Sequence, residues 1–217
     1  MSDERDARPA SGHENPDWPV AFRGVTESVV TTLGPNDLWN VAALGLHPPE
    51  ASDSPDESGE SDATVTARTW GNTRTRRNFH RRGGGYVQFT RDPVEFADAA
   101  LSIYEIEEPV LESADAWAEV TVERVDAGES GGTEWEEWEL VPRETGVERE
   151  TVPTVSRGFN AVVEATVAAS RLGVDAYDQS ALRDRLAYFE EVATSCGDRR
   201  VERAFDRIRE SVDAQLR

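Results

Sequence analysis

Short apolar or alternating segments, separated by turn-forming residues, fill the first two thirds of the chain and predict β-strands. Residues 27–33 are rich in β-branched side chains and end at a Gly-Pro-Asn-Asp turn at residues 34–37. The run that follows, residues 38–46, is apolar over most of its length. We therefore expect these two runs to pair as a hairpin, with the second strand buried on both faces.

The middle of the chain adds a short helix and further predicted strands. Asp92 and Pro93 have the form of a helix start, an N-cap acid followed by proline, and this helix is predicted to run to about Ser102. Residues 104–111 are expected to be a connector, and the Gly-rich residues 126–133 a turn. The alternating segments that we predict as strands are residues 63–70, 86–90, 116–125 and 134–141.

After Pro153 the hydrophobic period changes from two residues to the spacing of an amphipathic helix. Three helices are predicted, at residues 158–172, 178–194 and 198–216. A chain whose strands come first and whose helices come last is typical of the α+β class.

Composition limits the partners that the protein can have. The 217 residues carry a net charge of −20, and all 23 basic residues are arginine. A surface of this charge repels nucleic acid and anionic membranes. The composition resembles that of proteins from salt-loving archaea, where molar salt shortens the Debye length to about 3 Å. We interpret the acidity as an adaptation to the solvent rather than as a binding feature.

Cysteine, histidine and hydropathy exclude several further classes. One cysteine, Cys196, cannot form an internal disulfide, and the three histidines are scattered, so no zinc spacing is present. No apolar run approaches the roughly 20 residues that span a membrane. Residues 1–17 are polar and have no apolar stretch of the signal-peptide type. We expect a cytoplasmic protein without a metal.

Residues 68–82, which we call the basic segment, break the acidic pattern with six arginines, one histidine and no acid. Arginines this close together repel one another unless an anion offsets their charge. The planar guanidinium group of arginine matches the geometry of phosphate oxygens. Thr75 and Asn78 share a face on a helical turn, where an oxyanion would also meet free backbone N–H groups. The segment predicts a phosphate-binding turn at residues 73–78. The alternative is a solvated basic surface that balances nearby acids.

A second candidate lies in the predicted strand at residues 38–46. There Asn40, Val41 and Ala42 place an amide and a small residue inside an apolar run. Small residues allow a flat ligand to approach the backbone, although close packing inside a barrel explains them equally well. No Walker sequence, dinucleotide fingerprint or serine-nucleophile elbow is present.

These segments together resemble the FMN-binding split β-barrel superfamily of flavin reductase-like proteins. The resemblance lies in Val-Val-Thr-Thr at 29–32, Asn-Val-Ala-Ala at 40–43, Thr-Arg-Arg-Asn-Phe at 75–79 and Gly-Tyr-Val-Gln-Phe at 85–89. It is closest to an archaeal family of unknown function within that superfamily. Ala43 stands where the superfamily has a proline.

The resemblance implies an α+β fold, a split β-barrel over residues 18–155 followed by a C-terminal helical region at 156–217. It implies FMN as the cofactor and a homodimer as the assembly. A disordered tail at 1–17 and a flexible acidic loop at 48–62 are expected from composition. The residues expected to bind FMN are Thr73, Arg74, Thr75 and Asn78 at the phosphate, with Asn40, Val41 and Ala42 along the isoalloxazine edge.

A flavin-dependent oxidoreductase is the function that this reading favours, with FMN supplying the redox chemistry and with the substrate or electron donor unknown. His80 is the one titratable side chain beside the expected site, and no residue is assigned as catalytic. The alternative is a non-enzymatic binder or sensor of FMN or another phosphorylated metabolite. An RNA-binding surface using the basic segment with Tyr86 and Phe89 is a third possibility, which the net charge argues against.

Overall fold

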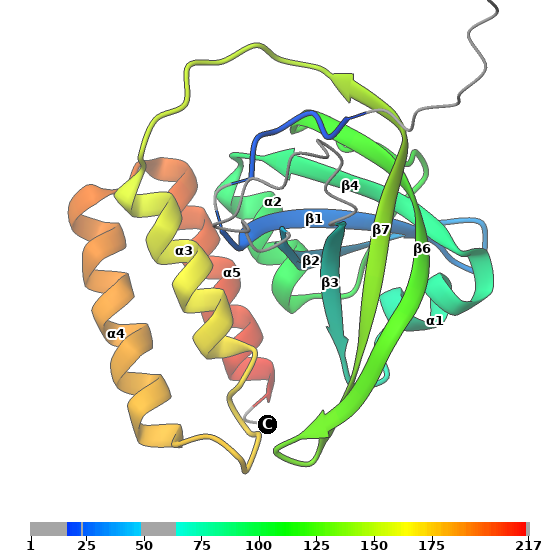
Figure 1. Cartoon of the computed structure of the whole chain (residues 1–217). Helices are drawn as coiled ribbons and strands as arrows, with labels where there is room; N and C mark the ends of the chain where they lie inside the picture. Colours follow the sequence, from blue (N-terminus) through cyan, green and yellow to red (C-terminus); the bar gives the residue numbers. More distant parts are fainter. Residues whose placement is uncertain (1–16, 23, 49–63, 216–217) are drawn as a thin grey trace, which may run out of the picture.

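The computed structural model describes residues 17–22, 24–48 and 64–215. The expected tail at 1–17 and the acidic loop at 48–62 therefore lie outside the described residues, apart from one residue of each. Six antiparallel strands close into a barrel in the order β1-β4-β6-β7-β3-β2, because β2 also pairs with β1 (Figure 1). The barrel strands are β1 (Thr26–Leu33), β2 (Trp39–His47), β3 (Val65–Trp70), β4 (Gly84–Thr90), β6 (Ala114–Ser130) and β7 (Thr133–Val147).

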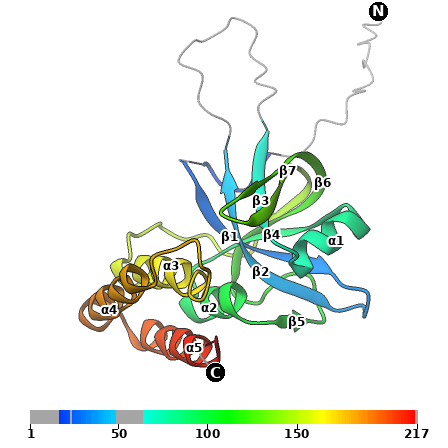
Figure 2. The ribbon, with the colours of Figure 1, turned by 90° about the horizontal axis from the view of Figure 1, so that it is seen from below.

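The helices occupy two different places around this barrel. α1 (Arg74–Arg82) connects β3 to β4 and lies on the side of the barrel away from the C-terminal helices (Figures 1 and 2). α2 (Pro93–Leu101) lies between the barrel and a layer made by α3 (Arg157–Ala169), α4 (Gln179–Cys196) and α5 (Arg199–Gln215). The α+β class and the three C-terminal helices are thus confirmed, while the division of the chain at residue 155 stays a prediction.

Two segments differ from the prediction. Within the expected connector at 104–111, Tyr104–Ile106 forms a short strand, β5, which pairs with β2. The expected turn at 126–133 is mostly strand, since β6 continues to Ser130 and β7 begins at Thr133. Gly131 and Gly132 alone make the turn, with positive φ. The exposed polar residues of its outer half have no apolar alternation, so the sequence resembled a long turn.

β1 is buried on both faces, since one face points into the barrel and the other packs against the helices. Residues 28–32 of β1 are all buried, whereas β2 is only partly buried, so the strand buried on both faces is the first and not the second. Val30 faces the barrel core and Val29 faces α2. The hydroxyl groups of Ser28 and Thr31 donate to the carbonyls of Leu44 and Pro109, so the buried polar atoms of β1 are satisfied.

Phe79 of α1 anchors the helix in the barrel. Its side chain is 1% exposed, belongs to the barrel core and lies 5.2 Å from the ring of Trp138 on β7. Among the described residues, no helix is long and apolar enough to cross a membrane, and no cluster of His, Cys, Asp and Glu has the arrangement of a metal site.

Candidate functional site

The basic segment folds into a capped helix rather than a single turn. Thr73 is the N-cap of α1, and its hydroxyl oxygen accepts from the backbone N–H of Arg76 at 3.2 Å. Gly83 ends the helix in the left-handed conformation, with φ of 67°, and donates to the carbonyl of Phe79. The last turn carries His80 and two arginines, and the arginine charges favourably oppose the negative end of the helix dipole.

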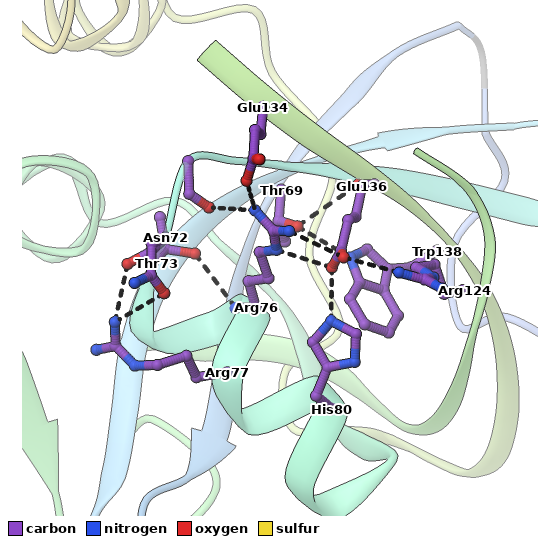
Figure 3. A network of polar contacts seen from close by, with 11 residues as sticks. Thr69, Asn72, Thr73, Arg76, Arg77, His80, Arg124, Glu134, Glu136 and Trp138 are labelled. Carbon is purple, nitrogen blue, oxygen red and sulfur yellow. Dashed lines mark hydrogen bonds and ion pairs between the residues drawn. The ribbon is translucent and has the colours of Figure 1, made fainter. Parts of the chain in front are cut away.

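One face of α1 is bound to a buried carboxylate, Glu136 of β7 (Figure 3). Arg76 holds it with two bonds, Nε to Oε2 at 2.9 Å and Nη2 to Oε1 at 3.0 Å. His80 Nε2 lies 2.7 Å from Oε2, and Arg124 of β6 donates to Oε1 at 3.1 Å. The Glu136 side chain is only 3% exposed, so these contacts replace the water that its charge loses on burial.

Burial by itself would raise the pKa of Glu136. The hydrogen bonds from Arg76, His80 and Arg124 outweigh burial and hold that pKa below its ordinary value. The carboxylate therefore remains charged and joins α1 to two strands of the barrel.

The other face of α1 lines a pocket of about 350 Å³. Four of its residues share one helical face, since Arg77 and Asn78 come three and four residues after Arg74, and Arg81 comes four and three residues after them. We call this cavity the arginine pocket. Its remaining wall comes from the β1–β2 turn, β2 and β5, namely Gly34, Pro35, Asn36, Asn40 and Glu105.

The arginine pocket carries more positive than negative charge. Arg74 Nη1 pairs with Oε1 of Glu105 at 2.7 Å, which offsets one cation. Arg77 donates to the carbonyl and side-chain oxygens of Asn72, at 2.9 and 3.1 Å. Arg81 donates to Oδ1 of Asn78 at 3.0 Å. Within the described parts of the chain, neither Arg77 nor Arg81 forms an ion pair.

Asn78 is the link between the pocket and the barrel. Its Nδ2 donates to the carbonyl and the hydroxyl of Thr32, at 3.3 and 3.0 Å, while its Oδ1 accepts from Arg81. Both amide protons therefore have partners in β1. The arrangement makes Asn78 a support that orients Arg81 rather than a free donor for a ligand.

The structure brings together three of the residues expected at the site, because Asn40, Arg74 and Asn78 all line the arginine pocket. Thr75 is buried beside them, and Asn40 Nδ2 lies 3.5 Å from its hydroxyl. Thr73 lies at the helix start and lines a different cavity.

The other two expected residues have their side chains in packed clusters. Val41 is 1% exposed and packs with Val29 and α2 outside the barrel, and Ala42 packs against the barrel core. Their assignment to the isoalloxazine edge stays a prediction.

Three charged residues of the pocket were missed by the sequence analysis. The spacing of Arg74, Arg77 and Arg81 along one helical face was visible in the sequence and could have identified the two additional arginines. Glu105 gave no such signal, since it reaches the pocket only because β5 pairs with β2 and places it opposite Asn40.

Comparison with known proteins identifies the family. Residues 26–149 match the family described as "Protein of unknown function (DUF447) N-terminal domain", and residues 156–210 match "Protein of unknown function (DUF447)". The chain belongs to the DUF447 family. This confirms the resemblance to an archaeal family of unknown function. No curated protein matches the chain.

Solved structures show the fold of this DUF447 protein. The FMN-bound protein MM1853 from Methanosarcina mazei is similar over 88% of this chain and 96% of its own, with 24% identity and a TM-score of 0.68. Flavoredoxin from Methanosarcina acetivorans matches 65% of this chain and 79% of its own, at 11% identity and a TM-score of 0.41. The fold is the flavin reductase-like, FMN-binding split β-barrel with additional C-terminal helices, as the sequence predicted.

The lowered pKa of Glu136 predicts a pH-dependent stability. A depressed folded-state pKa contributes stability above the ordinary carboxyl pKa, and this contribution is lost as the pH falls through the folded-state value. We expect Glu136→Gln to lower the free energy of unfolding by about 2 kcal/mol at pH 7. The loss is moderate because Arg124 and His80 are half exposed, so water can replace the contact that each makes with the carboxylate. Urea unfolding of both proteins at pH 7 and at decreasing pH measures this difference.

The difference between the two proteins should shrink as the pH falls, because the wild-type carboxyl then becomes neutral as well. Glu134→Gln is the matched control, since the Glu134 side chain is 72% exposed and touches Arg76 only at 3.3 Å. Its effect should stay below about 1 kcal/mol. A Glu136→Gln deficit of equal size at every pH would show that the charge of Glu136 does not contribute.

Proposed function

We propose that this chain binds FMN by its phosphate in the arginine pocket and works as a flavin-dependent oxidoreductase. The observation that carries the proposal is the pocket itself, which collects three arginines against one carboxylate in a chain of net charge −20. Phosphate oxygens are the acceptors that fit several guanidinium forks at once. The FMN-bound state of MM1853, which shares the fold, supports the choice of FMN.

The donor set of the pocket fits a phosphate group. Arg77 and Arg81 have donors beyond those bound to Asn72 and Asn78, since each guanidinium carries five N–H groups. Arg74 is held by Glu105 and would contribute its remaining donors. Asn40 offers an amide at the β2 wall. The backbone of Val41 and Ala42 continues from there and would lie along the flavin ring.

Bound FMN would supply electron and hydride transfer, and the protein would supply binding and orientation. Arg77 and Arg81 hold the phosphate, Asn78 orients Arg81, and Glu136 keeps the helix in place from its opposite face. The hydroxyl of Thr73 caps the helix, and Thr75 lies behind Asn40, so both act on the site through the position of α1.

We further propose that the protein acts as a cytoplasmic homodimer. The support is a row of partly exposed aromatic side chains across the barrel, in which Trp39 lies 5.4 Å from Tyr86 and Tyr86 lies 5.8 Å from Trp117. Apolar rings of this size on an outer face favour burial against another surface.

The phosphate assignment predicts a selective loss of FMN affinity. Replacing Arg77 and Arg81 together by Ala should weaken FMN binding by at least about a hundredfold, because two charge-assisted contacts are removed. Riboflavin, which has no phosphate, should bind both proteins equally. Flavin fluorescence quenching during titration measures both affinities.

Arg82→Ala is the control for these two substitutions, since Arg82 is exposed on the same helix and does not line the pocket. Its FMN affinity should equal that of the wild type. Equal weakening of FMN and riboflavin by the double substitution would place the phosphate elsewhere.

The oxidoreductase assignment predicts that a reduced nicotinamide reduces the bound flavin. The FMN-loaded protein, mixed without oxygen with NADH or NADPH, should lose its flavin absorption near about 450 nm, since the redox chemistry belongs to the cofactor. Stopped-flow absorption measures the rate, with free FMN at equal concentration as the control. A bound flavin that reacts no faster than free FMN with either nucleotide would favour the non-enzymatic binder or sensor.

The homodimer predicts a mass of twice 24.0 kDa in light scattering. Trp39→Ser together with Trp117→Ser should shift the protein towards the monomer, because the apolar area of the aromatic row is removed. Trp135→Ser is the control, since it removes a partly buried tryptophan from β7 outside this row. A monomeric wild-type protein across the measured concentrations would contradict the dimer.

A further inference from the structure

A second cavity, of about 640 Å³, lies on the other side of the α1 start. It forms where the tip of the β6–β7 hairpin meets the connection between α3 and α4, which lie side by side at the bottom of Figure 1. A Cβ on Gly131 at the hairpin tip would be 3.1 Å from the Cβ of Ala176, so these segments are in contact. We call this cavity the aromatic pocket, and its size is in the range of small-molecule sites.

The lining of the aromatic pocket is unusual for this protein because, among the residues that the structure describes, it contains no carboxylate. The chain has 43 aspartates and glutamates, and even the arginine pocket includes Glu105. Arg171 supplies the only charge of the described lining. Hydroxyl groups supply further donors, from Thr73, Ser130, Thr133 and Ser170.

Arg171 is held in a position that suits a ligand. Its guanidinium carbon lies 5.2 Å from the centre of the Tyr177 ring. No side chain among the described residues forms an ion pair with it. A cation without a carboxylate partner, in a chain so rich in carboxylates, is available to an anion from solution.

Two aromatic side chains give the pocket its apolar surface. Trp70 is 46% exposed and Tyr177 is 42% exposed, and both line the cavity. Trp70 packs at 6.5 Å against Trp135, over whose ring the guanidinium of Arg68 lies at 4.4 Å. Trp135 thus supports the Trp70 ring, which stays partly exposed at the cavity.

We propose that the aromatic pocket binds a planar aromatic anion. Its ring packs on Trp70 and Tyr177, and its carboxylate or phosphate binds Arg171 and the neighbouring hydroxyl groups. Ring stacking and a charge-assisted hydrogen bond then act on the two parts of one ligand. An aromatic carboxylate and a nucleotide both have this chemistry.

The site is separate from the one proposed for FMN. The two cavities share no lining residue, and Thr73 at the start of α1 lies on the wall of one while Arg77 and Arg81 line the other. The inference therefore does not depend on whether the arginine pocket holds FMN.

Calorimetric titration of the full chain, with and without saturating FMN, tests the proposal. The probes are AMP and benzoate, each with a neutral analogue, adenosine or benzyl alcohol. We expect at least one anion to bind at least about tenfold more tightly than its analogue, which is the effect of one charge-assisted contact. Binding of AMP alone identifies a nucleotide site, and binding of benzoate alone identifies an aromatic acid site.

Two substitutions assign that binding to the pocket. Arg171→Gln should reduce the affinity of the anion to that of its neutral analogue, and Tyr177→Ala should weaken both. Arg203→Gln on α5 removes the same charge from an exposed position outside the pocket and should change nothing.

The proposal is overturned if neither anion binds, or if Arg171→Gln binds as well as the wild type. It is also overturned if FMN displaces the probe and Arg171→Gln weakens FMN itself, because the pocket would then belong to the flavin. If the chain binds no FMN, the proposed function fails, but the titrations without FMN still decide this inference.

Discussion

The bidentate contact of Arg76 with the buried carboxylate of Glu136 is the interaction on which the candidate site depends. A helix lying on a barrel can rotate about its own axis unless something fixes it. Phe79 anchors α1 in depth, while the bonds from Arg76 and His80 to Glu136 fix its rotation. Because residues three and four apart share a helical face, fixing one face also fixes the other. The arginine pocket is therefore held in place by a charge that does not line it.

The two faces of α1 carry arginines with different functions. In the sequence alone these functions, anion binding and the balancing of nearby acids, are alternatives. On the side of Glu136, Arg76 balances acids of the protein itself, as a purely structural basic surface would. On the pocket side, Arg77 and Arg81 have amide or carbonyl partners and, in the described residues, no acid. An amide oxygen orients a guanidinium without neutralising it, so these cations keep their attraction for an anion. A charge count along the chain cannot separate the two faces.

The sequence predicted the elements better than it predicted the contacts between them. Alternation and helical spacing are local, and they identified the barrel strands and placed the three C-terminal helices within a few residues, although β6 and β7 continue five and six residues beyond their predicted ends. Glu105 and Glu136 reach the site through strand pairing, opposite Asn40 and Thr69, and no sequence window contains that register. Thr73 has a role that the arginine spacing did not predict, since its hydroxyl oxygen caps α1, while its assignment to the phosphate stays a prediction. The residue types in a short segment suggest which functions are possible, and the pairing of distant strands decides which residues meet at the site.

Since α1 contributes to both pockets, a ligand in one could in principle affect the other. Such coupling requires that each ligand bind two orientations of the helix with different affinity. The contacts of Arg76, His80 and Arg124 with Glu136 oppose rotation, and Phe79 opposes withdrawal from the barrel. Reorientation would leave a buried charge unpaired, which costs several kcal/mol in proteins. Either ligand would have to outweigh this cost before it could favour a second orientation, and we infer that the two pockets bind independently.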